Sequence, residues 1–358
     1  MTLPPELLEI IFLRLPVRSL IRLKCVCKQW RSLISDPYFA KLHYDVAIAP
    51  TINNNNKLLY LSSDSSKACC VKTEPSIHHD YPFKLQETYK NDSTRIIGSC
   101  RGFILLQNDK PKPFLILWNP ATSSHVRVPY PNNFSNSDFF CHGVVYEKSN
   151  DDYLVIMGSV GTLKGKRQWK FFSVRTNSWK EIEGGDCFTP NIAMAHQIGL
   201  LYNEAIHWVV VYNGSFVIVA FDIATKTLSM IPLPYPLDPN QWELSLVGGA
   251  GFFGICMMDH IWQHIWVMKE YKVQSSWILK MDILYPSDNT MIPLCFTESG
   301  DNVVWMNRII KDLVKFERLG GNEEELEEFK LDFCDKDTVL VMFNESLLSL
   351  PSSCRQEE

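Results

Sequence analysis

The sequence predicts a mainly β fold with a small all-α module at its N-terminal end. Within residues 3–35, apolar side chains recur at the i, i+3, i+4 and i+7 spacing of amphipathic helices. After Tyr44 this spacing stops, and short apolar runs alternate with turn-forming residues. These observations predict a helical module at residues 1–44, a β-domain at 45–350 and a C-terminal tail at 351–358.

The first predicted helix begins at two prolines. Pro4 and Pro5 suit the first turn of a helix, where a missing N–H costs no hydrogen bond. The apolar spacing continues to about Leu15, and Pro16 ends the helix. The sequence therefore predicts one short helix before Pro16.

Two further helical segments follow. Ser19 is a candidate N-cap for a helix that starts at Leu20. A third segment, which carries Val26 and Trp30, is expected to end before Asp36-Pro37, because the residue before proline avoids helical backbone angles. Three such short helices are too few to bury all their apolar side chains by themselves. They either cover the β-domain of the same chain or bind another protein.

The β-domain is predicted from short apolar runs that are separated by turn residues. Strands of this length and spacing indicate a β-sandwich or a β-propeller. The main runs are 57–63, 103–107, 114–124, 153–159, 169–179, 205–215, 216–228, 264–271, 276–284 and 339–343.

A weak internal repeat favours the propeller. Segments 115–129, 170–182 and 218–232 each contain an apolar run, a turn with a threonine and a second short strand. The same interval of 49 residues separates Trp179, Leu228 and Trp277. Repeats of forty to fifty residues with several strands each are typical of propeller blades, because stacked neighbouring sheets bury each other's faces. The residues after Tyr44 could hold about six blades.

Composition excludes several classes of function. The chain is 46% hydrophobic and 21% charged, as expected of a folded globular protein, and its net charge of −5 argues against general nucleic-acid binding. No run of eighteen apolar residues and no signal peptide is present, so no membrane association is expected. The eleven cysteines follow no disulfide framework, which predicts reduced thiols in the cytoplasm or the nucleus.

No catalytic, cofactor-binding or metal-binding motif is found. His260 and His264 are four residues apart, but they fall in a predicted strand, where that separation spans ~13 Å and is too long for one metal ion. The sequence contains no P-loop, no GxSxG motif and no dinucleotide-binding GxGxxG motif. We therefore expect a protein that is not an enzyme.

The N-terminal segment resembles the F-box. It follows that motif from the opening LP, through LPV/RSL and VCKQW, to the DPYF exit. The remainder resembles the F-box-associated domain of plant F-box/kelch proteins, a broad group that includes S-locus F-box proteins. The segments that carry this second resemblance are 98–106, 117–124, 142–156, 171–183, 205–211, 221–234 and 265–277.

The F-box resemblance implies a partner for the helices. F-box helices bind a SKP-type adaptor, which connects them through a cullin and a RING subunit to the ubiquitin-conjugating machinery. By this resemblance, the β-domain would bind an unidentified target protein. The residues expected to contact the adaptor or to pack the motif are Leu3, Pro4, Leu7, Leu8, Ile11, Leu15, Pro16, Leu20, Leu23, Val26 and Trp30.

The target-binding residues are not identified by the sequence. Loops at one rim of a propeller are the usual contact sites, because they vary without disturbing the sheets. The candidate loops are 130–140, 234–242 and 320–330. Two other functions remain open: a scaffold that does not promote degradation, and a separate propeller with binding or hydrolytic activity and a helical cap.

Overall fold

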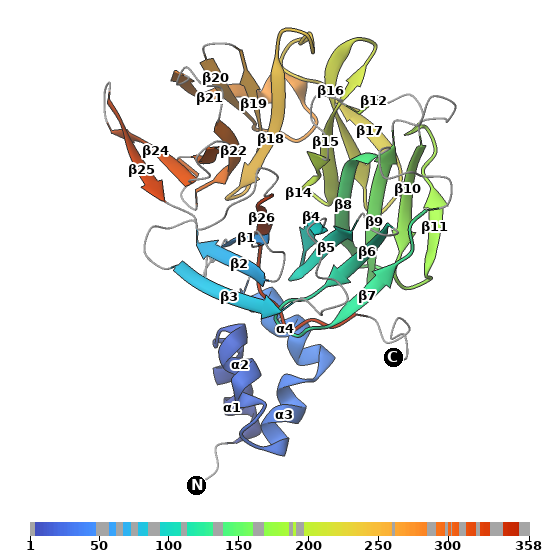
Figure 1. Cartoon of the computed structure of the whole chain (residues 1–358), viewed down its shortest axis with the longest axis vertical. Helices are drawn as coiled ribbons and strands as arrows, with labels where there is room; N and C mark the ends of the chain where they lie inside the picture. The colour runs from blue at the N-terminus through green and yellow to red at the C-terminus, as the bar shows by residue number, and fades with distance from the viewer. Residues whose placement is uncertain are drawn as a thin grey trace. The chain divides into compact units, whose positions relative to one another are not determined.

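The chain folds into two compact units, Met1–Pro129 with Val339–Glu358 and Tyr130–Thr338 (Figure 1). The structure is a computed structural model. It describes residues 4–47, 57–61, 67–72, 78–84, 94–108, 113–131, 139–159, 168–185, 189–190, 197–259, 262–284, 291–297, 300–301, 303–307, 313–319, 323–329 and 339–350.

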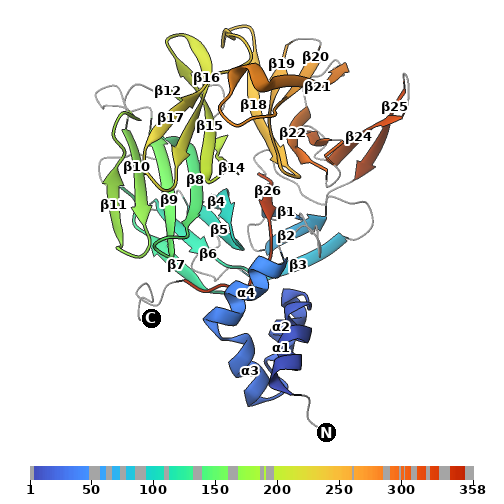
Figure 2. The same cartoon turned by 180° about the vertical axis from the view of Figure 1, so that it is seen from behind.

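Four short helices form the helical module of the first unit (Figures 1 and 2). They are α1 (Pro5–Leu13), α2 (Val17–Leu23), α3 (Lys28–Ile34) and α4 (Pro37–Ala47). The break at Pro16 is confirmed, but the prediction of Ser19 as an N-cap is wrong. Pro16 itself is the N-cap of α2, and its side chain makes no capping hydrogen bond.

Helix α4 was not predicted. Its start combines Asp36, whose Oδ1 accepts a hydrogen bond from Tyr38 N at 3.0 Å, with a proline at the first helical position. An acidic residue before a proline is a common signal for the start of a helix. The same two residues that end α3 therefore begin α4.

The core of the helical module is small. Leu8 and Phe12 lie one turn apart on α1 and are buried, as are Leu20 of α2 and Ile34 of α3. The ring of Phe12 meets the ring of Trp30 edge-on, with centroids 5.1 Å apart. These contacts connect α1 to α3.

A buried histidine connects α4 to the end of α1. His43 Nε2 lies 2.8 Å from the carbonyl oxygen of Leu15, so that nitrogen is the donor. The other ring nitrogen, Nδ1, is buried and has no hydrogen-bond partner. Burial lowers the pKa of His43 below its usual 6.5, although the bond to Leu15 partly opposes this shift. The folded module therefore favours the neutral imidazole.

Two four-stranded sheets complete the first unit. In one, the order β26-β1-β2-β3 places the last described strand beside the first. In the other, β4 to β7 follow sequence order. The strands are β1 (Lys57–Leu61), β2 (Lys67–Lys72), β3 (His78–Lys84), β4 (Thr94–Cys100), β5 (Phe103–Asn108), β6 (Phe114–Trp118), β7 (His125–Val128) and β26 (Val341–Phe343).

The C-terminal segment is fixed to the start of the β-domain by side chains as well as by strand pairing. Leu58 pairs with Met342 in the antiparallel register of β1 and β26. Nearby, Lys57 Nζ and Glu345 Oε1 form an ion pair of 2.9 Å, with both side chains largely buried. Ser99 Oγ also donates to the carbonyl oxygen of Met342.

Asn119 is the centre of a second set of contacts to this segment. Its side-chain amide donates to the carbonyl oxygens of Ser346, at 3.2 Å, and Leu348, at 2.9 Å. Ser346 Oγ donates to the carbonyl oxygen of Arg101 at 2.8 Å. The chain passes so close to Gly102 that a Cβ there would lie 2.1 Å from Ser346 Oγ, and the φ of +80° also favours glycine. We call Asn119 and the segment 341–348 the C-terminal clasp.

The turn repeat is visible in the hydrogen bonds. Asn119 O accepts from Ser123 N at 2.8 Å, and Asp222 O accepts from Lys226 N at 3.0 Å. Ser123 and Lys226 both have φ of 61°. In each turn the side chain of the first residue also accepts from backbone N–H groups two and three residues later. The repeated turns therefore share one conformation, which supports the sequence repeat at these two positions.

The second unit contains three sheets. Two of them are five-stranded, with the strands β11-β10-β9-β8-β13 in the first and β12, β14, β15, β16 and β17 in the second. Their strands are β8 (Phe139–Glu147), β9 (Asp152–Ser159), β10 (Gln168–Ser173), β11 (Ser178–Glu181), β12 (Thr189–Pro190), β13 (Gln197–Ile198), β14 (Leu200–Tyr202), β15 (Ala205–Tyr212), β16 (Ser215–Asp222) and β17 (Leu228–Ile231).

The third sheet has eight strands in two antiparallel sets. A single parallel pair, Gly248 with Cys295, joins the sets. Among the described residues of the whole chain, the antiparallel pairings therefore form six strand sets, in keeping with the predicted repeat. The strands of this sheet are β18 (Glu243–Gly249), β19 (Phe252–Met258), β20 (Trp262–Met268), β21 (Trp277–Leu284), β22 (Met291–Phe296), β23 (Val303–Asn307), β24 (Leu313–Leu319) and β25 (Glu323–Phe329).

The acidic segment 320–330 is not the surface loop that we expected. Glu323–Phe329 forms β25, which pairs along its length with β24. In that register Arg318 lies opposite Glu324 and Lys315 lies opposite Glu327. The run of glutamates misled the interpretation, because the sequence of a strand does not show which strand it pairs with.

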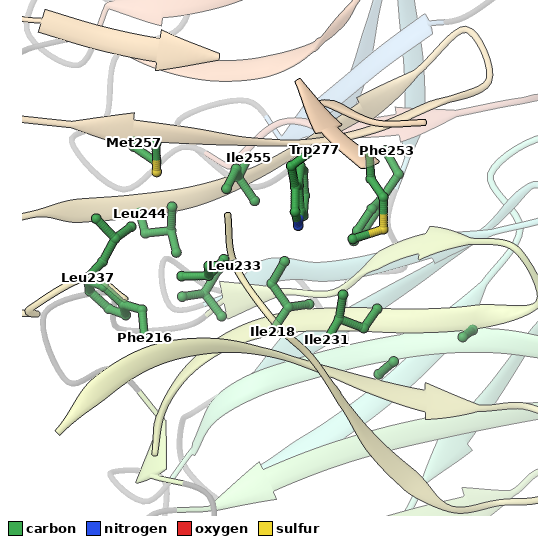
Figure 3. Packing of buried hydrophobic residues seen from close by; sticks show 14 residues of the cluster. Phe216, Ile218, Ile231, Leu233, Leu237, Leu244, Phe253, Ile255, Met257 and Trp277 are labelled. Atoms are coloured by element: carbon green, nitrogen blue, oxygen red, sulfur yellow. The ribbon is translucent and has the colours of Figure 1, made fainter. Parts of the chain in front are cut away.

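A large apolar core joins β15 and β16 to β18–β21 (Figure 3). Leu233 and Leu237, from the connection after β17, are both buried in this core. Leu233 lies between Ile218 and Leu244, and Leu237 lies beside Phe216 (Figure 3). The connection between β17 and β18 is therefore anchored in the core by these two leucines, which restricts its motion.

The C-terminal clasp gives a prediction on stability. Replacing Asn119 by Ala leaves buried carbonyl oxygens of Ser346 and Leu348 without donors, and we expect a loss of roughly 2–4 kcal/mol in the free energy of unfolding. Urea unfolding measures the loss, and hydrogen exchange of residues 339–350 locates it. Asp222→Ala is the matched control, because it removes the same turn contacts without the clasp. Equal losses in the two variants would contradict this assignment.

His43 gives a prediction on pH. Its folded-state pKa is below the unfolded value, so its contribution to stability is complete above pH 6.5 and is lost as the pH falls below that value. We expect peptides of α1 and α4 to lose protection from hydrogen exchange between pH 7.5 and 5.5, after correction for intrinsic rates. His43→Gln keeps a donor but does not titrate, and should remove most of this dependence. An unchanged pH dependence in the glutamine variant would exclude His43 as its source.

Candidate functional site

The helical module has a second apolar surface that faces solvent. Leu7, Ile10 and Ile11 lie at i, i+3 and i+4 on α1, on a different face from Leu8 and Phe12. Their exposed fractions are 48%, 50% and 44%. We call these three residues the exposed face of α1. An apolar helix face of this kind is typical of a surface that another protein covers.

Other apolar residues of the module are also exposed. Val26, in the turn between α2 and α3, is 60% exposed, and Tyr38 of α4 is 69% exposed. The Cys27 thiol accepts a weak hydrogen bond from Trp30 N and caps α3, so the turn that carries Val26 is held next to a defined helix start. The module thus presents apolar side chains from more than one element.

The predicted adaptor set divides according to burial. Leu8 and Leu20 belong to the core, whereas Leu7, Ile11 and Val26 are exposed. Of the remaining residues, Pro4 and Pro16 are exposed, Leu15, Leu23 and Trp30 are half-buried, and Leu3 lies outside the described residues.

The predicted adaptor set omitted Ile10, Phe12 and Tyr38. Ile10 and Phe12 each follow an apolar residue of the same face by three or four positions, so the α1 sequence already contained two overlapping apolar stripes. A helix with two apolar stripes buries one stripe in its own module and leaves the other for a second contact. The two stripes could therefore have separated the core residues from the exposed face.

The structure describes the three predicted target-binding loops to different extents. Most of 130–140 lies outside the described residues. The segment 320–330 includes strand β25, as described above. The loop 234–242 is described completely, and hydrogen bonds hold the chain just before it and the second half of the loop. Trp277 Nε1 donates to the carbonyl oxygen of Pro232 at 2.9 Å, and Asp238 O accepts from Trp242 N at 3.1 Å.

The sequence analysis expected that His260 and His264 do not form a metal site. His264 lies in strand β20, and His260 is outside the described residues. Within the described ranges, no group of three or more His, Cys, Asp or Glu side chains is arranged to hold a metal ion. In the same part of the chain, no helix is long and apolar enough to span a membrane.

Comparison with known proteins agrees with both parts of this description. Residues 1–42 match the F-box domain, and residues 52–350 match the F-box associated beta propeller domain. An F-box/kelch-repeat protein of Arabidopsis thaliana is 28% identical over 77% of this chain and 78% of its own length. The F-box protein CPR1 of the same plant is 25% identical over 85% of this chain and 79% of its own length.

These matches confirm the predicted fold class, a short helical F-box module followed by a mainly β, propeller-like domain. The β-domain match covers more than half of the chain, and the helical match covers the module that carries the exposed face of α1. The chain therefore belongs to the family of F-box proteins with an F-box-associated β-propeller domain.

Proposed function

We propose that this chain is the substrate-recognition subunit of an SCF-type ubiquitin ligase. The helical module binds a SKP-type adaptor and, through it, cullin and RING subunits, and the β-domain binds a target protein for ubiquitination. The observation that carries the proposal is the exposed face of α1, Leu7, Ile10 and Ile11, within a segment that matches the F-box.

Burial of the exposed face of α1 would favour association with another protein. Complete burial of a leucine or isoleucine side chain contributes roughly 1.5–3 kcal/mol, and these three side chains are about half exposed. Burying them, together with Val26, offsets part of the entropy cost of association. Leu8 and Phe12 hold the helix from the other side, so the face is already ordered before binding.

The proposed mechanism is positioning and not chemistry. A receptor that holds its target beside a charged conjugating enzyme raises the effective concentration of the target's lysine side chains. The chain itself would then need no catalytic group, and we propose that it is not an enzyme. Such a role places it in the cytoplasm or the nucleus, where the free cysteines of the described residues would remain reduced.

The exposed face of α1 gives a direct prediction. Leu7→Asp/Ile11→Asp should weaken binding to a plant SKP-type adaptor at least about a hundredfold, because charge cannot be buried in an apolar contact without a large cost. The variant should still fold, since both side chains are exposed, and the substitution at Leu7 puts a negative charge in the first turn of α1, where the helix dipole favours it. Titration of the purified chain with the adaptor measures the effect.

The matched control is Leu201→Asp/Met230→Asp. Leu201 and Met230 are each 47% exposed, like the residues of α1, but they lie on strands of the β-domain. We expect this variant to bind the adaptor as tightly as the unsubstituted chain. Failure of the unsubstituted chain to bind, or equal losses in both double variants, would refute the proposed adaptor surface. Leu8 and Leu20 are unsuitable for this test, because they are buried and their substitution would unfold the module.

The fate of the bound target separates degradation from scaffolding. A ligase subunit predicts that proteins captured by the β-domain accumulate when the proteasome is inhibited, and that Leu7→Asp/Ile11→Asp abolishes this dependence. A scaffold predicts capture without accumulation. A separate enzyme with a helical cap would instead keep its activity after loss of adaptor binding.

A further inference from the structure

The β-domain carries a partly exposed cluster of aromatic and acidic side chains that adaptor binding does not explain. It lies where strands β20 and β21 meet the loop 234–242. We call it the aromatic–acidic cluster. Its members are Tyr235, Trp242, Asp259, Trp262, His264, Trp266 and Asp282.

Strand alternation brings several of these residues to one face. Trp262, His264 and Trp266 alternate along β20 and therefore project from the same side of the sheet. His264 is paired with Asp282 of β21 in the antiparallel register. Trp262 is 40% exposed, so this face is accessible to solvent at that end of the strand.

The loop supplies the other aromatic rings. Tyr235, also 40% exposed, meets Trp266 edge-on with ring centroids 5.9 Å apart. Trp242 contacts the His264 ring at 6.0 Å. The loop is held rigidly, because Leu233 and Leu237 on either side of Tyr235 are buried in the core (Figure 3).

Proline further restricts this loop. Pro234 and Pro236 flank Tyr235, and Pro239 follows Asp238, so three backbone φ angles are fixed. Gln274 Nε2 donates to the carbonyl oxygen of Leu233 at 2.8 Å and ties the loop to the segment before β21. An aromatic residue presented on such a rigid loop loses little entropy on binding.

Two carboxylates lie among the rings. Asp282 Oδ1 is 2.6 Å from His264 Nδ1, and Asp259 Oδ2 is 3.9 Å from His264 Nε2. Asp259 Oδ1 also accepts from Trp262 N at 2.6 Å. Burial, and then the charges of Asp282 and Asp259, raise the pKa of the Tyr235 hydroxyl.

The cluster is acidic in either state of its histidine. Two carboxylates outweigh one imidazole even when the imidazole is protonated. Lys280, the nearest lysine along β21, lies over the ring of Phe252, 4.4 Å from its centroid. Phe252 packs against the core on the side of Val247 and Met281, so the Lys280 charge is directed away from the cluster.

We propose that the aromatic–acidic cluster binds a basic segment of the target protein, with an arginine or lysine side chain placed on the exposed aromatic rings and paired with Asp282 and Asp259. Aromatic faces attract cations, and carboxylates at the edge of such a site add a charge-assisted hydrogen bond. The inference deepens the proposed function, because it names the chemical class of the target surface.

The test uses the full chain and short synthetic peptides. In one peptide arginine alternates with glycine, in a second lysine replaces arginine, and in a third glutamate does. Calorimetric titration should show that the arginine and lysine peptides bind at least tenfold more tightly than the glutamate peptide. Trp262→Ala and Asp282→Lys should each weaken arginine-peptide binding about tenfold.

Glu183→Lys is the matched control for charge. Glu183 is exposed and lies after β11, outside the cluster, so the substitution makes the same change in net charge. We expect its effect to be under twofold. Absence of peptide binding, equal binding of the acidic and basic peptides, or equal losses for Glu183→Lys and Asp282→Lys would overturn the inference.

Adaptor titration of the same proteins separates the two proposals. Trp262→Ala and Asp282→Lys should bind the SKP-type adaptor normally. Urea unfolding of the same proteins should show that their β-domains remain folded. Adaptor binding without selective binding of basic peptides would overturn only the aromatic–acidic cluster. Selective peptide binding without adaptor binding would overturn the proposed ligase role and leave the cluster as a site for basic segments.

Discussion

The first unit depends on the return of the C-terminal segment to the start of the β-domain. Strand β26 supplies a neighbour for β1, and Asn119 holds the residues that follow β26 through hydrogen bonds in a fully buried site. A strand edge without a partner exposes backbone donors and acceptors. Pairing the two ends of the domain satisfies those groups and makes the sheet's stability depend on residues nearly three hundred positions apart.

In the helical module, one helix carries both buried and exposed apolar residues. Its helices are short, so they cannot bury a large core, and α1 serves two surfaces at once. Leu8 and Phe12 hold it to the module, while Leu7, Ile10 and Ile11 remain exposed. This arrangement keeps the exposed face of α1 ordered, although its apolar side chains contact solvent. It also explains why the apolar residues of a recognition motif do not all have the same role.

The β-domain combines a rigid core with rigid display of surface residues. In the second unit, the connection after β17 places Leu233 and Leu237 in the core and Tyr235 at the surface. Large aromatic groups on an ordered loop provide contact area without a large loss of entropy. The specificity of such a surface for its target would then depend on which aromatic rings and charged groups are neighbours on it.

The fold class, the break at Pro16 and the repeated turns follow from the sequence alone. These features depend on local periodicity and turn chemistry, as in the matching turns at Asn119 and Asp222. Three other features became known only from the fold: which apolar residues of α1 face inward, the pairing of the acidic run before Phe329 as a strand, and the contact of Tyr235 with Trp266. Each of these depends on contacts between residues of different elements, and local spacing does not encode which elements become neighbours.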